Sequence, residues 1–198
     1  DMTFEIPSVT NSGILDFSNR TLNLKGSSFQ GVGTVTGTGT LRFIPTNGFS
    51  LFNANGPAVT IGSGTVEYQS GGTVSGPLTV DPGATLAMNT SGSLTASGDV
   101  TVNGSLTKTG GNPQFAFNGQ TFTNNGTVGN IDFMTFNDGN GPPVQFVQGI
   151  GTWLPTNIQV GAGPSTTLNL GTNVNFTTNQ LITASGAAID VGNLTLTM

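Results

Sequence analysis

The chain has 198 residues, enough for one sizeable domain, with only four basic and nine acidic residues and a net charge of −5. So few Lys and Arg form no clustered basic patch, which disfavours binding to nucleic-acid phosphates and to anionic membranes. The 32 Thr, 21 Asn, 15 Ser and 31 Gly predict a surface of hydroxyls, amides and backbone, and the 34 % of hydrophobic residues supply a core without any run long enough for membrane insertion.

Short strands are predicted from the N-terminal part onward. Apolar residues recur two apart, as in Leu22 and Leu24 and again in Leu41 and Phe43. This is the period of a β-strand with one buried face. Gly, Asn, Asp or Pro interrupts the pattern at short intervals, so the strands are short and the fold class is all-β.

The clearest repeat covers residues 64–108. The segment 76–86 recurs, slightly shortened at its turn, as 98–106, and the segments that begin at Gly64, Ala84 and Gly104 follow one another at equal spacing. A unit of about 20–22 residues with three short strands is typical of one rung of a β-solenoid (β-helix). Stacked rungs line Val, Leu and Ile along one interior, which a single rung cannot bury alone. We therefore predict one β-solenoid domain over residues 1–198.

Residues 115–157 are less regular. The stretch 115–146 holds six of the 13 Phe and the turn-rich run 137–143. We expect the Phe side chains to fill a wider core layer, and the alternative is an exposed apolar patch for a partner. The uneven spacing leaves a β-sandwich or jelly roll open as the alternative fold. The strand rhythm returns after residue 158, for example at Leu168 and Leu170.

Two places are candidates for binding. Asn137, Asp138 and Asn140 carry the hard oxygen ligands that Ca²⁺ takes, but they supply one carboxylate and also suit an ordinary turn. The leading expectation is therefore no metal or other cofactor, with calcium as the alternative. Trp153 is the single Trp; we expect it to close one end of the core, and stacking on a sugar is the alternative.

The composition predicts that the chain is not an enzyme. Without His or Cys it has neither a serine-type triad nor a thiol nucleophile with its usual base. Sugar hydrolysis needs two facing carboxylates, whereas most of the acidic residues stand in turn-forming contexts. The acidic residues considered for such a pair are Asp16, Glu67, Asp81, Asp99, Asp132, Asp138 and Asp190.

Thr-x-Thr runs, such as the one within residues 34–40, raise the question of an ice-binding surface. The Thr residues do not hold one face at one spacing over many coils, so we expect them to be strand residues with a polar solvent face and not a hydroxyl lattice. A carbohydrate- or ice-binding module is therefore the alternative function.

Residues 76–86, 122–128 and 184–196 resemble the repeat units of large bacterial surface and secreted proteins, namely the filamentous-haemagglutinin and autotransporter-like β-strand-repeat families. The resemblance implies a β-solenoid, an extracellular location and a role in adhesion, matrix or fibre building. It carries no catalytic residues over to this chain.

The leading expectation is a secreted structural or adhesive module at the cell surface, such as a stalk, an adhesin or a fibre subunit. The open ends of a solenoid expose strand edges that are templates for another subunit. The expected partners are therefore copies of the chain itself, joined end to end or by strand exchange into a filament, or glycans and other cell-surface targets. A polysaccharide-degrading enzyme is the least favoured function. The start at Asp1 predicts a processed form or an excised fragment.

Overall fold

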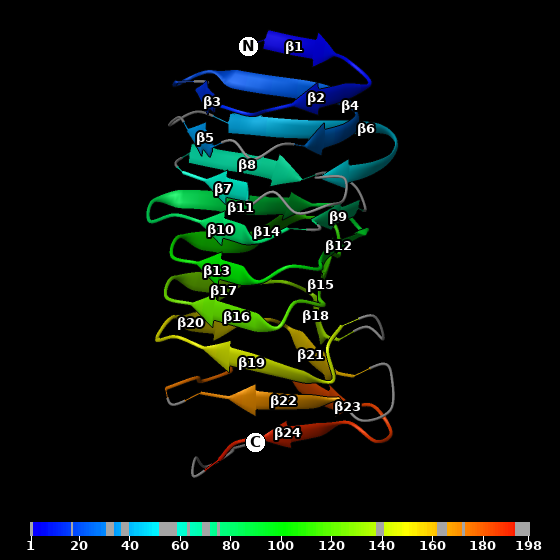
Figure 1. Ribbon diagram of the computed structural model, residues 1–198, viewed down its shortest axis with the longest axis vertical. Coiled ribbons are helices and arrows are strands. Elements are labelled where there is room, and N and C mark those ends of the chain that lie inside the picture. The colour runs from blue at the N-terminus through cyan, green and yellow to red at the C-terminus, as the bar shows by residue number, and fades with distance from the viewer. Residues whose placement is uncertain are drawn as a thin grey trace.

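The computed structural model consists of β-strands and their connections over the residues that it describes (Figure 1). These residues are 2–16, 18–30, 34–36, 40–51, 59–62, 64–68, 72–74, 76–137, 141–161, 166–171 and 173–192. The strands are stacked along the long axis of the molecule, and β1 and β24 lie at opposite ends. The fold is the predicted β-solenoid.

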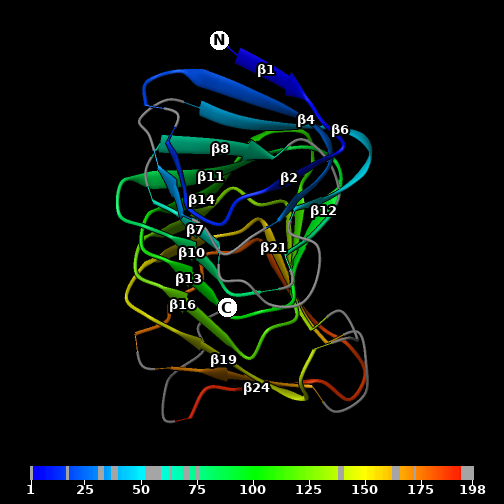
Figure 2. The same ribbon diagram turned by 45° about the horizontal axis from the view of Figure 1, so that its top comes forward.

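The strands belong to three parallel sheets, which we call A, B and C and which form the sides of the solenoid (Figure 2). Sheet A contains β1 (Met2–Glu5), β2 (Ser8–Thr10), β4 (Thr21–Gln30), β6 (Thr40–Leu51), β8 (Gly64–Tyr68), β11 (Ala84–Asn89), β14 (Ser105–Gly110), β17 (Thr127–Gly129) and β20 (Thr152–Leu154). Sheet B contains β3 (Ile14–Asp16), β5 (Thr34–Thr36), β7 (Val59–Ile61), β10 (Leu78–Val80), β13 (Val100–Val102), β16 (Thr121–Asn124), β19 (Val144–Gln148), β22 (Thr167–Leu170) and β24 (Ala188–Asp190). Sheet C contains β9 (Gly72–Val74), β12 (Ser93–Ala96), β15 (Gln114–Phe117), β18 (Phe133–Phe136), β21 (Asn157–Val160) and β23 (Gln180–Thr183).

The strand register confirms the repeat predicted over residues 64–108. In sheet A, Val66 pairs with Leu86 and Leu86 pairs with Leu106, at equal steps along the chain. In sheet B, Leu78 pairs with Val100, as the alignment of segments 76–86 and 98–106 requires. Every strand pair within the described residues is parallel, whereas sandwiches and jelly rolls are built from antiparallel strands. The alternative fold is therefore wrong.

The predicted rung of three strands holds for only part of the chain. From β7 to β21 the chain passes through sheets B, A and C in turn. Before β7 the described strands belong to sheets A and B, and the sheet A strands β4 and β6 have 10 and 12 residues. The rung length also varies more widely than predicted. The step between register partners is short from Val59 to Leu78 and clearly longer from Val128 to Trp153. The corners absorb the difference, so strand pairing continues without a break.

The core is a column of inward-facing side chains inside the three sheets. Between residues 115 and 136 it is widened by aromatic rings, as predicted: Phe115, Phe117, Phe122 and Phe136 are fully buried. Phe122 contacts the other three rings edge to face, with ring centroids 5.3 to 6.4 Å apart. Phe146 differs, because β19 points its neighbours inward and leaves its own ring 40 % exposed.

The corner between sheets B and A brings successive rungs into close contact. The N–H of Gly126 donates to the carbonyl of Val102, and the N–H of Gly104 makes the equivalent bond one rung earlier. The buried side chain of Asn124 holds this corner, because its Oδ1 accepts from the Gly126 N–H and its Nδ2 donates to the Thr152 carbonyl. The amide of Asn124 thus satisfies backbone groups that would otherwise be buried without partners.

Candidate functional site

Ser and Thr residues form a column of register partners across sheet A. Register partners from β4 to β20 place a Ser or Thr at the same position in seven consecutive strands. The column consists of Thr21, Thr40, Thr65, Thr85, Ser105, Thr127 and Thr152. Its last five members are at least partly exposed. Adjacent strands are about 4.8 Å apart, so these last five members form a regular row of hydroxyl groups along the solenoid axis.

A second, shorter column lies on sheet B. Register partners in five consecutive strands are Thr34, Thr60, Thr79, Thr101 and Thr123. The next strand continues it with Gln148, whose Nε2 donates to the Thr123 hydroxyl at 3.0 Å. The expectation that the Thr residues do not hold one face over many coils is therefore wrong, although their spacing in the sequence is uneven. The rungs differ in length, so residues that lie side by side in the sheet are unevenly spaced in the sequence.

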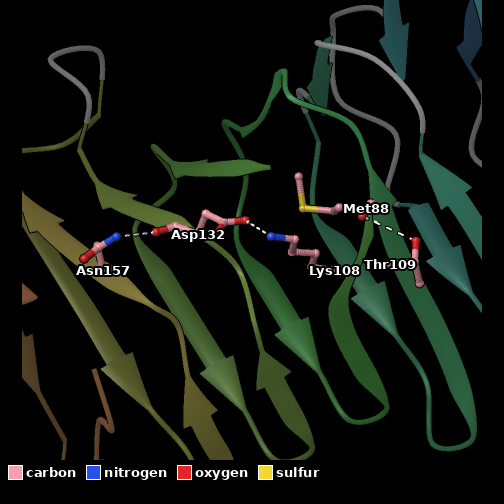
Figure 3. Close-up of polar contacts among 5 residues, drawn as sticks. All are labelled: Met88, Lys108, Thr109, Asp132 and Asn157. Atoms are coloured by element: carbon pink, nitrogen blue, oxygen red, sulfur yellow. Dashed lines mark hydrogen bonds and ion pairs between the residues drawn. The ribbon is translucent and has the colours of Figure 1, made fainter. Parts of the chain in front are cut away.

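A chain of polar contacts follows the corner between sheets A and C (Figure 3). Lys108 Nζ lies 2.7 Å from Asp132 Oδ2, and the backbone carbonyl of Asp132 accepts a hydrogen bond from Asn157 Nδ2. Thr109, beside Lys108, donates to the carbonyl of Met88 at 3.4 Å. Each contact joins one rung to the next, so this cluster stabilises the stack. Both charged groups are used within the pair, and each side chain is mostly covered by its neighbours.

The predicted turn role holds for only part of the acidic set, including the side chains of Asp16 and Asp190, because other acidic side chains bond between rungs. Asp99 Oδ1 accepts from the backbone N–H groups of Gln120 and Thr121 on the following rung. The side chains of Asp16 and Asp190 each accept from the N–H two positions further along the chain. Asp81 starts a turn through its carbonyl, which accepts from the Ala84 N–H. Within the described ranges, no group of three acidic residues gathers in a way that would hold a metal ion.

Of the calcium candidates, only Asn137 lies within the described residues; Asp138 and Asn140 lie outside them. The Asn137 side chain is buried and its Nδ2 donates to the Pro142 carbonyl and to the Thr166 hydroxyl. Its Oδ1 accepts from the Gly141 N–H at 3.0 Å. These bonds tie both ends of the 137–143 connection to the neighbouring rung, which is a structural role for Asn137.

Trp153 lies in the core with 1 % of its surface exposed. Its indole packs between Phe122 and Phe176, with ring centroids 5.0 and 5.2 Å away. Neither face of the ring is on the surface, so a sugar has no access to it in this conformation. Trp153 is therefore a core residue, but it does not close the end of the core. It lies one rung before the last described layer, where Phe176 pairs with it through a parallel β-bridge.

Glu5 and Tyr68 have pKa values shifted from those of the free side chains. The hydrogen bond from Lys25, together with its positive charge, lowers the pKa of the Glu5 carboxyl. Burial raises the pKa of the Tyr68 phenol, which faces inward from β8. The first shift reflects an exposed pair on the outer face of sheet A, and the second reflects the core.

The sequence matches no protein-family model, and neither a curated protein nor a solved structure is significantly similar to it. Within the part of the chain that the structure describes, there is no helix long and apolar enough to cross a membrane. The class of the molecule is therefore defined by its fold, a β-solenoid.

Proposed function

We propose that the chain is a secreted structural or adhesive module of a cell surface, a rigid segment of a stalk or fibre. The observation that carries the proposal is continuity: register partners connect strands from Met2 to Asp190 around one apolar core. Backbone hydrogen bonds between rungs therefore run along the axis, the direction in which a stalk or fibre bears tension. The resemblance to bacterial surface repeats supports the extracellular location, and the proposal assigns the chain no catalytic role and no cofactor.

The proposal includes assembly with further copies of the chain. A solenoid grows by adding parallel strands to its end, and a contact that does not close on itself produces a filament. Electron microscopy of the purified chain over a range of concentrations tests this. We expect rods of one width whose length increases with concentration. Particles of a single length at every concentration would refute assembly.

The columns of hydroxyl groups favour a second candidate function, the binding of a regular polymer or crystal surface, either a polysaccharide or ice. The seven hydroxyl residues on sheet A are in register at the strand spacing. Thermal-hysteresis measurements and glycan arrays test this candidate. If it is correct, Thr85→Lys in the middle of the column abolishes the signal while Thr95→Lys on sheet C leaves it unchanged. No signal in either assay removes the candidate.

A further inference from the structure

The N-terminal edge of the solenoid exposes part of its core layer. In β1, Met2 and Phe4 are 41 % and 46 % exposed, although residues at the equivalent positions in the middle of sheet A, such as Val66 and Leu86, are almost completely buried. Within the described residues β1 is paired on one side only, with β4. Its outer backbone groups and its inward-facing side chains are thus available to one more strand.

The opposite edge has the complementary arrangement. Within the described residues, sheets B and C end at β24 and β23, and Phe176 continues sheet A by a parallel bridge to Trp153. Inward-facing residues of this last layer, including Phe176, Leu181 and Ile189, pack against the core but are only partly buried. Among the described residues, this edge therefore presents parallel strands of all three sheets, which is what the N-terminal edge would meet in a continued solenoid.

One column of register partners connects the two edges through sheet A. It starts at Met2 and ends at Phe176, and it passes through Leu22, Leu41, Val66, Leu86, Leu106, Val128 and Trp153. The column beside it, which faces outward, starts at Thr3 and passes through Leu154, so the next position in the last layer is Thr177. Thr3 and Thr177 are both exposed.

We infer that the partner at the N-terminal edge is the C-terminal edge of a second copy of this chain, in a joint that continues the sheet A register. Met2 of one copy then covers Phe176 of the other, and Thr3 lies beside Thr177. The inference rests on the proposed assembly and specifies its contact. A parallel joint fits because each rung inside the molecule already makes it with the next, with the same strand direction and the same inward apolar layer.

Cysteine cross-linking of the full chain tests the joint, and the chain has no Cys of its own. Adjacent strands lie about 4.8 Å apart, within the Cα separations that disulfides span. Under mild oxidation we expect the double variant Thr3→Cys, Thr177→Cys to form a covalent series of dimers, trimers and longer chains. The matched control Thr3→Cys, Thr95→Cys, with its second cysteine on the side of the solenoid, is expected to form no such series.

The single variants separate this joint from other contacts. Efficient dimerisation of Thr3→Cys alone would show contact between two N-terminal edges and overturn the inference, and so would an equal series from the control. Filaments in the microscope without the Thr3 to Thr177 link would also overturn it while leaving assembly intact. The absence of both filaments and link would refute assembly as well.

A charge variant gives an independent readout. Phe4→Glu places a carboxylate in the inward layer of the joint. Ile14→Glu changes an apolar residue that is 76 % exposed on β3, the edge strand of sheet B, where Leu15 and not Ile14 packs against the core. We expect Phe4→Glu to remove the concentration-dependent increase in mass seen by light scattering and Ile14→Glu to retain it. Equal behaviour of the two variants, with unchanged circular dichroism, would contradict the joint.

Discussion

Replacing Gly126 by Ala tests the close stacking of rungs at the corner between sheets B and A. A Cβ at Gly126 would overlap the backbone carbonyl oxygen of Gly104 on the preceding rung. A backbone atom cannot relieve this clash by a side-chain rotation. Gly129, at the end of β17, the strand that follows this corner, is the matched control. A Cβ there would lie 3.5 Å from the Thr127 methyl group and 3.9 Å from the Thr107 hydroxyl, which are ordinary contacts. Neither glycine has a positive φ, so the backbone conformation suits Ala at both positions.

The two substitutions are expected to change the free energy of unfolding in opposite directions. At Gly129 the loss of backbone freedom in the unfolded chain makes Ala favourable by about 0.5–1 kcal/mol. At Gly126 the same gain is opposed by overpacking, which costs about 1–3 kcal/mol. Displacing the corner also weakens the hydrogen bonds of the Gly126 N–H to Val102 and Asn124, at about 1 kcal/mol. We therefore expect Gly126→Ala to lower the free energy of unfolding by about 1–3 kcal/mol and Gly129→Ala to leave it unchanged or slightly raised.

The assay is urea denaturation followed by two probes. Fluorescence of the single Trp, Trp153, reports on the rung that follows the corner, and circular dichroism reports on all the strands. A repeat protein can unfold in sections, so the two probes show whether the loss is local or extends along the stack. Equal stabilities of the two variants, within about 0.5 kcal/mol, would refute the stacking of Gly126 on Gly104.

Three further predictions follow from burial and charge. Phe122→Ala removes the ring that contacts three other Phe rings, and we expect it to lower the free energy of unfolding by about 3–5 kcal/mol. Phe146→Ala, at a partly exposed ring, should lower it much less. Equal shifts in the denaturation midpoint would contradict the aromatic layer. Burial raises the pKa of the single Tyr, Tyr68, so an alkaline absorbance titration should show its ionisation only on unfolding. The free energy of unfolding should fall as the pH rises above about 10, the pKa of an unfolded Tyr. Ionisation near that pH with unchanged circular dichroism would exclude the burial of Tyr68. Because Lys25 lowers the pKa of Glu5, the pair contributes to stability above the ordinary Glu pKa and loses this contribution as the pH falls through the lowered pKa. Lys25→Met should return the NMR titration midpoint of Glu5 to its ordinary range. An unchanged midpoint would show that the pair does not form.

The sequence was sufficient for the fold class where rungs have nearly equal length. Segments that begin at Gly64, Ala84 and Gly104 align without gaps, and the structure pairs Gly64 with Ala84 and Thr85 with Ser105 as that alignment requires. Alternation of apolar residues also identified which side chains face inward, because a strand exposes its two faces in turn. The aromatic layer was predicted from the density of Phe in residues 115–146, and it ends at Phe136 because the Phe146 ring is 40 % exposed.

Candidate functional surfaces were harder to predict, because they depend on which residues lie side by side. Thr65 has register partners in both neighbouring strands, and the step along the chain from Thr40 to Thr65 is longer than the step from Thr65 to Thr85. A search at one fixed period therefore misses their column. The signal was present in the Thr residues that open successive strands, and an alignment of strands that allowed corners of variable length would have found it.

The sequence by itself indicated short strands around an apolar interior and predicted solenoid rungs over residues 64–108, since residue alternation and a short, regular repeat are local properties. Only the tertiary structure decided where the corners lengthen, and with that which hydroxyl groups form columns and which apolar residues remain at the edges. Corner length is set by how loops fit around neighbouring rungs, as Asn137 shows by bonding to Pro142 and Thr166. Such contacts between residues far apart in the sequence leave no period to detect.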